Sequence, residues 1–127
     1  MAQFDVHRNP GRHRDSIPFV VIVQSTLYDD YRRRVVVPLV NESSLGKVVN
    51  PRFNPTFRIQ GQSVVLHPLE IVSVARENLG EWVDSLQKEG DRIISALDEL
   101  LTRVRGKPFR AGKDSATPTQ HDPAAAV

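Results

Sequence analysis

The fold is decided by two β-branched runs, Phe19-Val20-Val21-Ile22-Val23-Gln24-Ser25 and Arg32-Arg33-Arg34-Val35-Val36-Val37-Pro38-Leu39, which a short polar turn separates. Their separation predicts an antiparallel hairpin. Both runs are nearly continuous in apolar residues instead of alternating, which is typical of strands covered on both faces. We therefore expect a packed core on one face of this hairpin and a helix or a second subunit on the other. Pro38 is expected to end the second strand.

Further strands are predicted on both sides of this hairpin. Residues 3–7 alternate like a short edge strand, and residues 56–59 and 63–67 form a second hairpin around Gln60-Gly61-Gln62. Residues 69–76 are one more β-rich run, and residues 41–49 are expected to be a connecting loop with a helical turn. The chain is therefore predicted to be mainly β up to this point.

From Leu79 onward the apolar residues recur at spacings of three and four, which predicts an amphipathic helix. Gly90 interrupts the pattern, so the helix either begins near Gln87 or is in two pieces, the second running from residue 91 to about 105. Trp82 is interpreted as a core residue or as an aromatic side chain at the helix start. We expect one domain over residues 1–105 and a disordered tail over residues 106–127, which are rich in Ala, Gly, Pro, Thr and Ser.

Composition limits the chemistry that the chain can perform. The absence of cysteine excludes disulfides, a thiol nucleophile and thiolate-bound zinc. The four histidines lie in separate segments, so neither a metal site nor another cofactor is expected. A formal net charge of +2 does not argue for direct nucleic-acid binding. Without an apolar leader or a membrane-length apolar run, we expect a soluble, cytoplasmic protein.

Five segments, taken in order, carry a family resemblance: Gln3-Phe4-Asp5-Val6, the two β-branched runs, the hairpin region 54–61, and Arg92-Ile93-Ile94-Ser95-Ala96-Leu97-Asp98. With a single helix at the end, their arrangement resembles the CcdB family of bacterial toxins over roughly residues 1–104. The resemblance implies a mainly β fold with a C-terminal α-helix: an SH3-like barrel related to the MazF toxins, with a five-stranded antiparallel sheet and a small three-stranded sheet.

The resemblance also implies a function. Family members are homodimers, and pairing would cover the second apolar face of the hairpin. They are toxins of type II toxin–antitoxin systems that bind the A subunit of DNA gyrase, a topoisomerase, and trap its covalent complex with cleaved DNA. A CcdA-type antitoxin neutralises them. They are not enzymes.

The target contact is implied at the end of the helix. Family members that poison gyrase end there with an aromatic residue, a glycine and an apolar residue, and the aligned positions in this chain are Thr102-Arg103-Val104. Glycine permits close approach, whereas arginine brings bulk and a charge. We expect Leu101, Thr102, Arg103 and Val104 to face the target, although on structural grounds Leu100, Leu101 and Val104 also suit helix core or dimer packing.

The antitoxin is expected to contact the loop with Arg8, Arg12 and Arg14 and the segment with Leu45 and Val48. Acidic disordered tails favour grooves that arginines line. The Arg32–Arg34 triplet is interpreted as a solvated strand end instead of a phosphate-binding patch, because its members point to opposite faces.

Two other functions remain open from sequence alone. One is an RNA-cleaving toxin of the MazF type, in which Arg14 with Ser16, or Arg33 with Ser25, supplies phosphate stabilisation. Neither pair forms a recognisable motif. The other is a CcdB-like protein without toxicity that binds an antitoxin.

Overall fold

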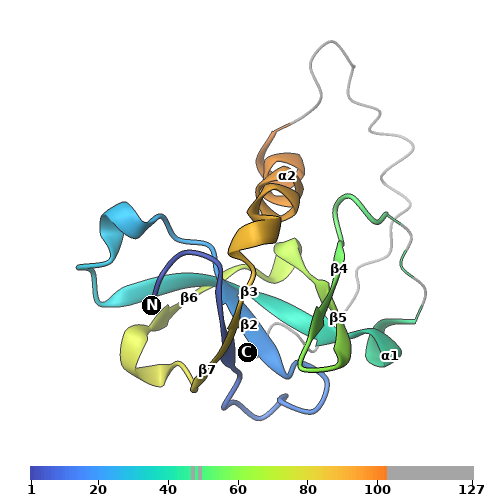
Figure 1. Cartoon of the computed structure of the whole chain (residues 1–127), viewed down its shortest axis with the longest axis horizontal. Helices are drawn as coiled ribbons and strands as arrows, with labels where there is room; N and C mark the ends of the chain where they lie inside the picture. Colours follow the sequence, from blue (N-terminus) through green and yellow to red (C-terminus); the bar gives the residue numbers. More distant parts are fainter. Residues whose placement is uncertain (47, 49, 103–127) are drawn as a thin grey trace.

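The computed structural model describes residues 1–46, 48 and 50–102, which form a curled antiparallel sheet and a C-terminal helix (Figure 1). The α-helices of the described residues are α1 (Glu42–Leu45) and α2 (Gly90–Leu101). The strands of the described residues are β1 (Asp5–Arg8), β2 (Phe19–Ile22), β3 (Arg33–Asn41), β4 (Thr56–Ile59), β5 (Gln62–Leu66), β6 (Val72–Ala75) and β7 (Trp82–Ser85).

Strand β3 is the centre of the sheet because its nine residues are long enough to pair with two strands, one after the other, along the same edge. Its first half, Arg33–Val36, pairs with β6, and its last residues, Leu39–Asn41, pair with β5. The order β7-β1-β2-β3-β6 gives five strands, and β3-β5-β4 gives three. The expected mainly β fold, with a five-stranded and a three-stranded antiparallel group and a helix at the end, is confirmed.

The expectation that Pro38 ends the strand is wrong, because β3 continues to Asn41. Pro38 lies where β3 changes partner from β6 to β5. Its carbonyl accepts a hydrogen bond from the amide of His67 at 3.1 Å, so its nitrogen also points to that side and away from β2. The missing N–H therefore removes no bond from the β2–β3 ladder, where Pro38 stands opposite Val20.

The second hairpin forms as expected. Gln60 and Gly61 connect β4 to β5 with positive φ angles of 51° and 80°. This is the geometry of a two-residue hairpin turn, which glycine adopts without strain. The helical turn expected within residues 41–49 is also present: it is α1, which directly follows β3.

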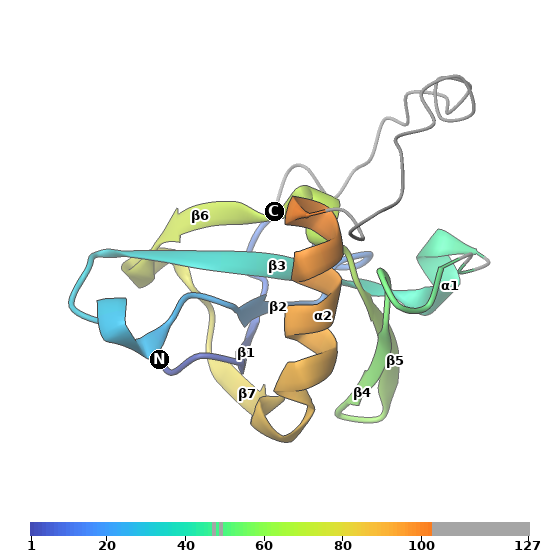
Figure 2. The ribbon, with the colours of Figure 1, turned by 90° about the horizontal axis from the view of Figure 1, so that it is seen from above.

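The central strands are covered on both faces within this single chain. On one face, α2 and the β4–β5 hairpin close the main core (Figure 2). On the other face, Val20, Ile22 and Val36 pack against side chains of β6 and the segment that follows it: Val72, Val74 and Leu79. The apolar pattern of the hairpin therefore does not by itself require a second subunit.

Of the two alternatives for the helix, a first helical piece at residues 82–86 is wrong, and a start near Gln87 is close to the observed start at Gly90. The edge position of the first strand is also wrong. Trp82–Ser85 is strand β7, which pairs with β1, so β1 lies between β2 and β7. Pairing with a segment far away in the sequence overrides the helix-like spacing of the apolar residues. Trp82 is neither in the core nor at a helix start: it lies on β7 and is 55% exposed.

The first residue of α2 is a glycine, Gly90, and the ring of Phe4 occupies the space beside it. A Cβ added to Gly90 would lie 2.5 Å from Cε2 of Phe4. The helix ends at Leu101, where the amide and hydroxyl of Thr102 donate to the carbonyl of Asp98 at 2.8 and 2.7 Å. The helix is thus shorter than predicted at its C-terminal end, and the predicted tail over residues 106–127 lies outside the described residues.

Substituting Gly80 by alanine should destabilise the fold. The segment between β6 and β7 is held against β1 by the bond from the Gly80 amide to the Arg8 carbonyl, and a Cβ at Gly80 would overlap that carbonyl oxygen. We expect Gly80→Ala to lower the free energy of unfolding by about 1–3 kcal/mol, the usual cost of overpacking. Urea denaturation measures this, with Asn78→Ala in the same segment as the control. Equal effects of both variants would contradict the proposed overlap.

Candidate functional site

The C-terminal end of α2 exposes apolar side chains. Ile93 and Ala96 are buried in the core, whereas Leu101 is 76% exposed and Ile94 is also exposed. Ile94 and Leu101 are seven residues apart and therefore share one flank of the helix. Leu101 is thus not a core residue of the single chain, although it had suited that role in the sequence.

The other flank of α2 is occupied. The Arg92 guanidinium lies 4.4 Å from the centre of the Phe57 ring, donates to the Thr56 carbonyl at 2.9 Å and pairs with Glu89 at 2.6 Å. Arg92 and Ile94 differ by about 200° around the helix axis. The exposed apolar flank therefore faces away from β4.

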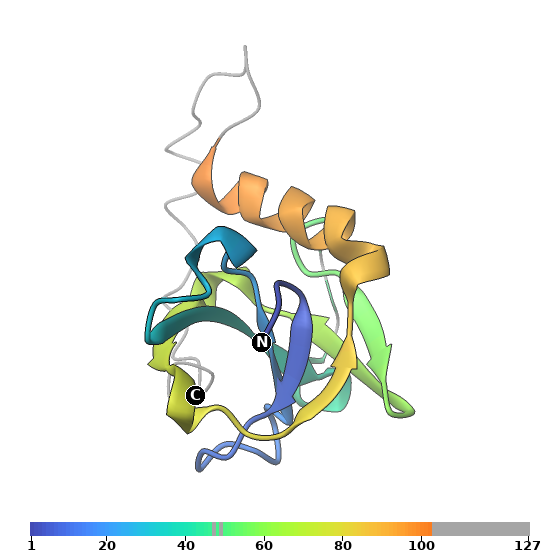
Figure 3. The ribbon, with the colours of Figure 1, turned by 60° about the vertical axis from the view of Figure 1, so that its left-hand side comes forward.

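A second apolar group lies in the loop after β2, which was predicted to be a polar turn. Leu27 is 86% exposed, and the rings of Tyr28 and Tyr31, both exposed, meet edge to face with their centroids 5.8 Å apart. Figures 1 and 3 place this loop on the same side of the sheet as α2. The sequence did contain a sign of this apolar group, because three large side chains, Leu27, Tyr28 and Tyr31, occur in one short turn.

This loop is held in shape by Arg34. The Arg34 side chain is 2% exposed, and its guanidinium donates to the backbone carbonyls of Asp29, Tyr31 and Arg33 at 2.6–3.0 Å. The interpretation of the triplet as a solvated strand end is therefore wrong for Arg34, while Arg32 and Arg33 are exposed as expected. A buried guanidinium that binds three carbonyls presents the aromatic residues of the loop on a rigid base.

The sequence-predicted target residues are described only in part. Leu101 and Thr102 are exposed at the helix end, and Arg103 and Val104 lie outside the described residues. The structure therefore does not describe position 103, where this sequence has arginine in place of the family's glycine.

The two segments predicted to contact an antitoxin meet in space. The amide of Asn41, which precedes α1, donates to the Ser16 carbonyl at 2.7 Å, and Leu45 packs against Ile17 and Val40. Val48 is partly buried. The loop between β1 and β2 and the α1 segment are therefore neighbours.

The three arginines of the β1–β2 region differ in their availability. Arg8 pairs with Glu81 at 2.7 Å and donates to the Gln60 side chain. Arg12 and Arg14 are exposed, and Arg14 donates to the Gly11 carbonyl at 3.3 Å. Arg12 and Arg14 are thus more available to an acidic partner than Arg8.

The residue pairs considered for catalysis are engaged elsewhere. Ser16 donates to the His13 carbonyl instead of meeting Arg14. Arg33 donates to Ser73, and the Ser25 hydroxyl accepts the amide of Leu27. In the described part of the chain, no three His, Cys, Asp or Glu side chains lie together in a way that could hold a metal ion.

Comparison with known families decides where this fold belongs. A family model described as "CcdB protein" matches residues 3–103. The chain belongs to the CcdB family. No curated protein matches this CcdB-family chain.

The fold also occurs in a solved structure of another protein. The match is the structure titled "Endoribonuclease in complex with its cognate antitoxin from Mycobacterial species", with a TM-score of 0.63 over 87% of this chain and 99% of that one. The two sequences are 14% identical, so this likeness supports the CcdB/MazF-like fold alone. Among the described helices of this CcdB-family chain, none has the length and apolar character needed to cross a membrane.

Replacing Arg34 should loosen the loop after β2. Arg34→Lys removes the forked guanidinium that binds three loop carbonyls, so we expect the free energy of unfolding to fall by about 1–3 kcal/mol. Hydrogen exchange should become faster for the amides of residues 26–33. The exposed Arg32→Lys variant is the control and should change neither measurement. Unchanged exchange in Arg34→Lys would contradict the role assigned to this side chain.

Proposed function

We propose that this chain is the toxin of a type II toxin–antitoxin system. In this proposal it binds the A subunit of DNA gyrase as a homodimer, traps the covalent complex of gyrase with cleaved DNA, and is neutralised by a CcdA-type antitoxin. Membership of the CcdB family supports the toxin role. The observation that carries the contact is the exposed apolar end of α2, with Leu101 at its tip.

The proposed target surface is larger than the helix end. It consists of Leu101 at the end of α2, and Leu27, Tyr28 and Tyr31 in the loop after β2, all of them exposed. Exposed groups of large apolar side chains mark protein interaction sites, and tyrosine is enriched among the residues that dominate binding energy. The Arg34 contacts reduce the ordering cost of binding because the loop is already fixed.

We place the homodimer contact on the side of the sheet that α2 covers. Since the second face of the central hairpin is covered within the chain, a twin subunit has to use other apolar surface. The flank of α2 that carries Ile94 faces away from β4 and is free for such a contact in the described part of the chain. A twofold dimer would present two copies of the helix end to a symmetric target.

The substitution Leu101→Asp tests the target contact. We expect Leu101→Asp to lower gyrase-mediated cleavage of supercoiled plasmid at least tenfold, because a charge would be buried in the contact without a partner. Gln87→Asp, on the exposed segment before α2, is the matched control and should keep full activity. Sedimentation equilibrium of both variants separates loss of the dimer from loss of the target contact. Full activity of a dimeric Leu101→Asp protein would refute the proposed surface.

Regulated expression separates the three functions that the sequence left open. Without an antitoxin, we expect DNA replication to stop before translation, and the purified protein to leave RNA intact. Cleavage of purified RNA would replace the gyrase proposal with that of a MazF-type nuclease. Unaffected growth with normal protein levels would point to the non-toxic, antitoxin-binding alternative.

A further inference from the structure

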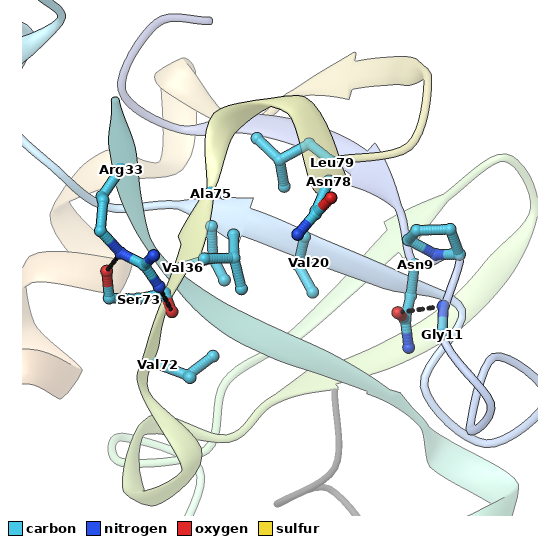
Figure 4. A pocket seen from close by; sticks show the side chains of 12 residues that line it. Asn9, Gly11, Val20, Arg33, Val36, Val72, Ser73, Ala75, Asn78 and Leu79 are labelled. Carbon is cyan, nitrogen blue, oxygen red and sulfur yellow. Dashed lines mark hydrogen bonds between the residues drawn. The ribbon is translucent and has the colours of Figure 1, made fainter. Parts of the chain in front are cut away.

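A hollow of about 470 Å³ opens on the face of the sheet opposite α2 (Figure 4). Apolar side chains of β2, β3, β6 and the following segment line it: Val20, Val36, Val72, Val74 and Leu79. Asn9, Arg33, Ser73 and Asn78 supply the polar part of its lining. Its size and its apolar walls with a few polar groups are typical of a binding site.

The strand beside this hollow, β6, has one free edge. It pairs only with β3 among the described strands. The amide of Arg76 donates to the Arg32 carbonyl, so the next pair of the ladder, Arg33 with Ala75, is not hydrogen-bonded. The alternation of the ladder therefore points the backbone groups of Ser73 and Ala75 away from β3. The Ser73 carbonyl accepts from the Arg33 side chain, so the Ser73 amide and the amide and carbonyl of Ala75 are the groups that another strand can bind.

Arg33 marks the chemistry of this edge. Its Nε and Nη2 donate to the hydroxyl and the carbonyl of Ser73 at 2.8 and 2.7 Å (Figure 4). These bonds leave the Nη1 group of an exposed guanidinium available at the rim of the hollow. It is the one charged side chain among the residues that line the hollow.

The surroundings add positive charge. Pro10 and Gly11 belong to the lining, and Arg14, bound to the Gly11 carbonyl, and Arg12 follow in the same loop. Arg12, Arg14 and Arg33 have no carboxylate partner among the described residues, whereas Arg8 and Arg32 pair with Glu81 and Glu77. The rim therefore suits an acidic occupant.

We propose that an extended, acidic segment of the antitoxin binds as an added strand along the free edge of β6. Backbone hydrogen bonds to Ser73 and Ala75 hold the strand, one of its apolar side chains fills the hollow, and a carboxylate pairs with Arg33. This strand-addition site depends on the proposed function in one respect: the bound segment belongs to an antitoxin. The site is separate from the surface around Leu101.

A defined peptide tests the site without knowledge of the antitoxin sequence. The probe is the blocked heptapeptide Asp-Val-Glu-Leu-Glu-Val-Asp, titrated into the full chain and followed by amide NMR shifts. We expect the largest shifts at Ser73 and Ala75, and at least tenfold weaker binding when lysine replaces every acid. Methylation of alternate backbone nitrogens should weaken binding in one register only, because a strand uses alternate amides for the ladder.

Two matched arginine variants complete the test. Arg58, like Arg33, is exposed and donates to a serine hydroxyl and a backbone carbonyl, but it lies on the β4–β5 hairpin. We expect Arg33→Gln to weaken peptide binding at least tenfold and Arg58→Gln to leave it unchanged. Both variants should keep their urea midpoint and their gyrase-dependent DNA cleavage.

Each negative result has a distinct meaning. No binding, binding that shifts other residues, or equal effects of Arg33→Gln and Arg58→Gln would overturn the strand-addition site while leaving the gyrase proposal intact. Tighter binding of a single-stranded RNA heptamer at Ser73 and Ala75 would overturn it in favour of a nucleic acid. If the wild-type protein binds the peptide but does not promote DNA cleavage by gyrase, the proposed target alone is refuted.

Discussion

The structure depends on one constraint: the central strands β2 and β3 are apolar on both faces, and one chain has to cover both. Helix α2 and the β4–β5 hairpin cover the first face. For the second face the chain bends β6 and residues 76–80 over Val20, Ile22 and Val36. The sheet consequently curls into a half-barrel, and this curl leaves both the free edge of β6 and the hollow beside it.

Local patterns predicted the parts of the fold that depend on neighbours in sequence. The β2–β3 and β4–β5 hairpins and the apolar face of α2 follow from composition, turn residues and spacing. Strand β7 was missed because its apolar residues happen to follow a helical spacing, and only pairing with β1 makes them a strand. Pro38 was misjudged because a change of strand partner cannot be seen in a local sequence.

The candidate site was predicted less completely than the fold. The family resemblance indicated the end of α2, where Leu101 is indeed exposed. It did not indicate Leu27, Tyr28 and Tyr31, because a turn with two aspartates reads as polar and exposure depends on tertiary structure. The burial of Arg34 was equally hidden, since its partners are backbone carbonyls, which every sequence contains. The two proposed surfaces lie on opposite faces of the sheet, so one subunit has room for both partners.

The carbonyl contacts of Arg34 have a consequence for how such a protein changes over generations. A loop shaped by main-chain oxygens around one buried cation tolerates new side chains at its tip, because the Arg34 contacts do not depend on which side chains stand there. Positions 27, 28 and 31 can therefore diversify, and the binding preference of this exposed surface can change, while the scaffold stays intact.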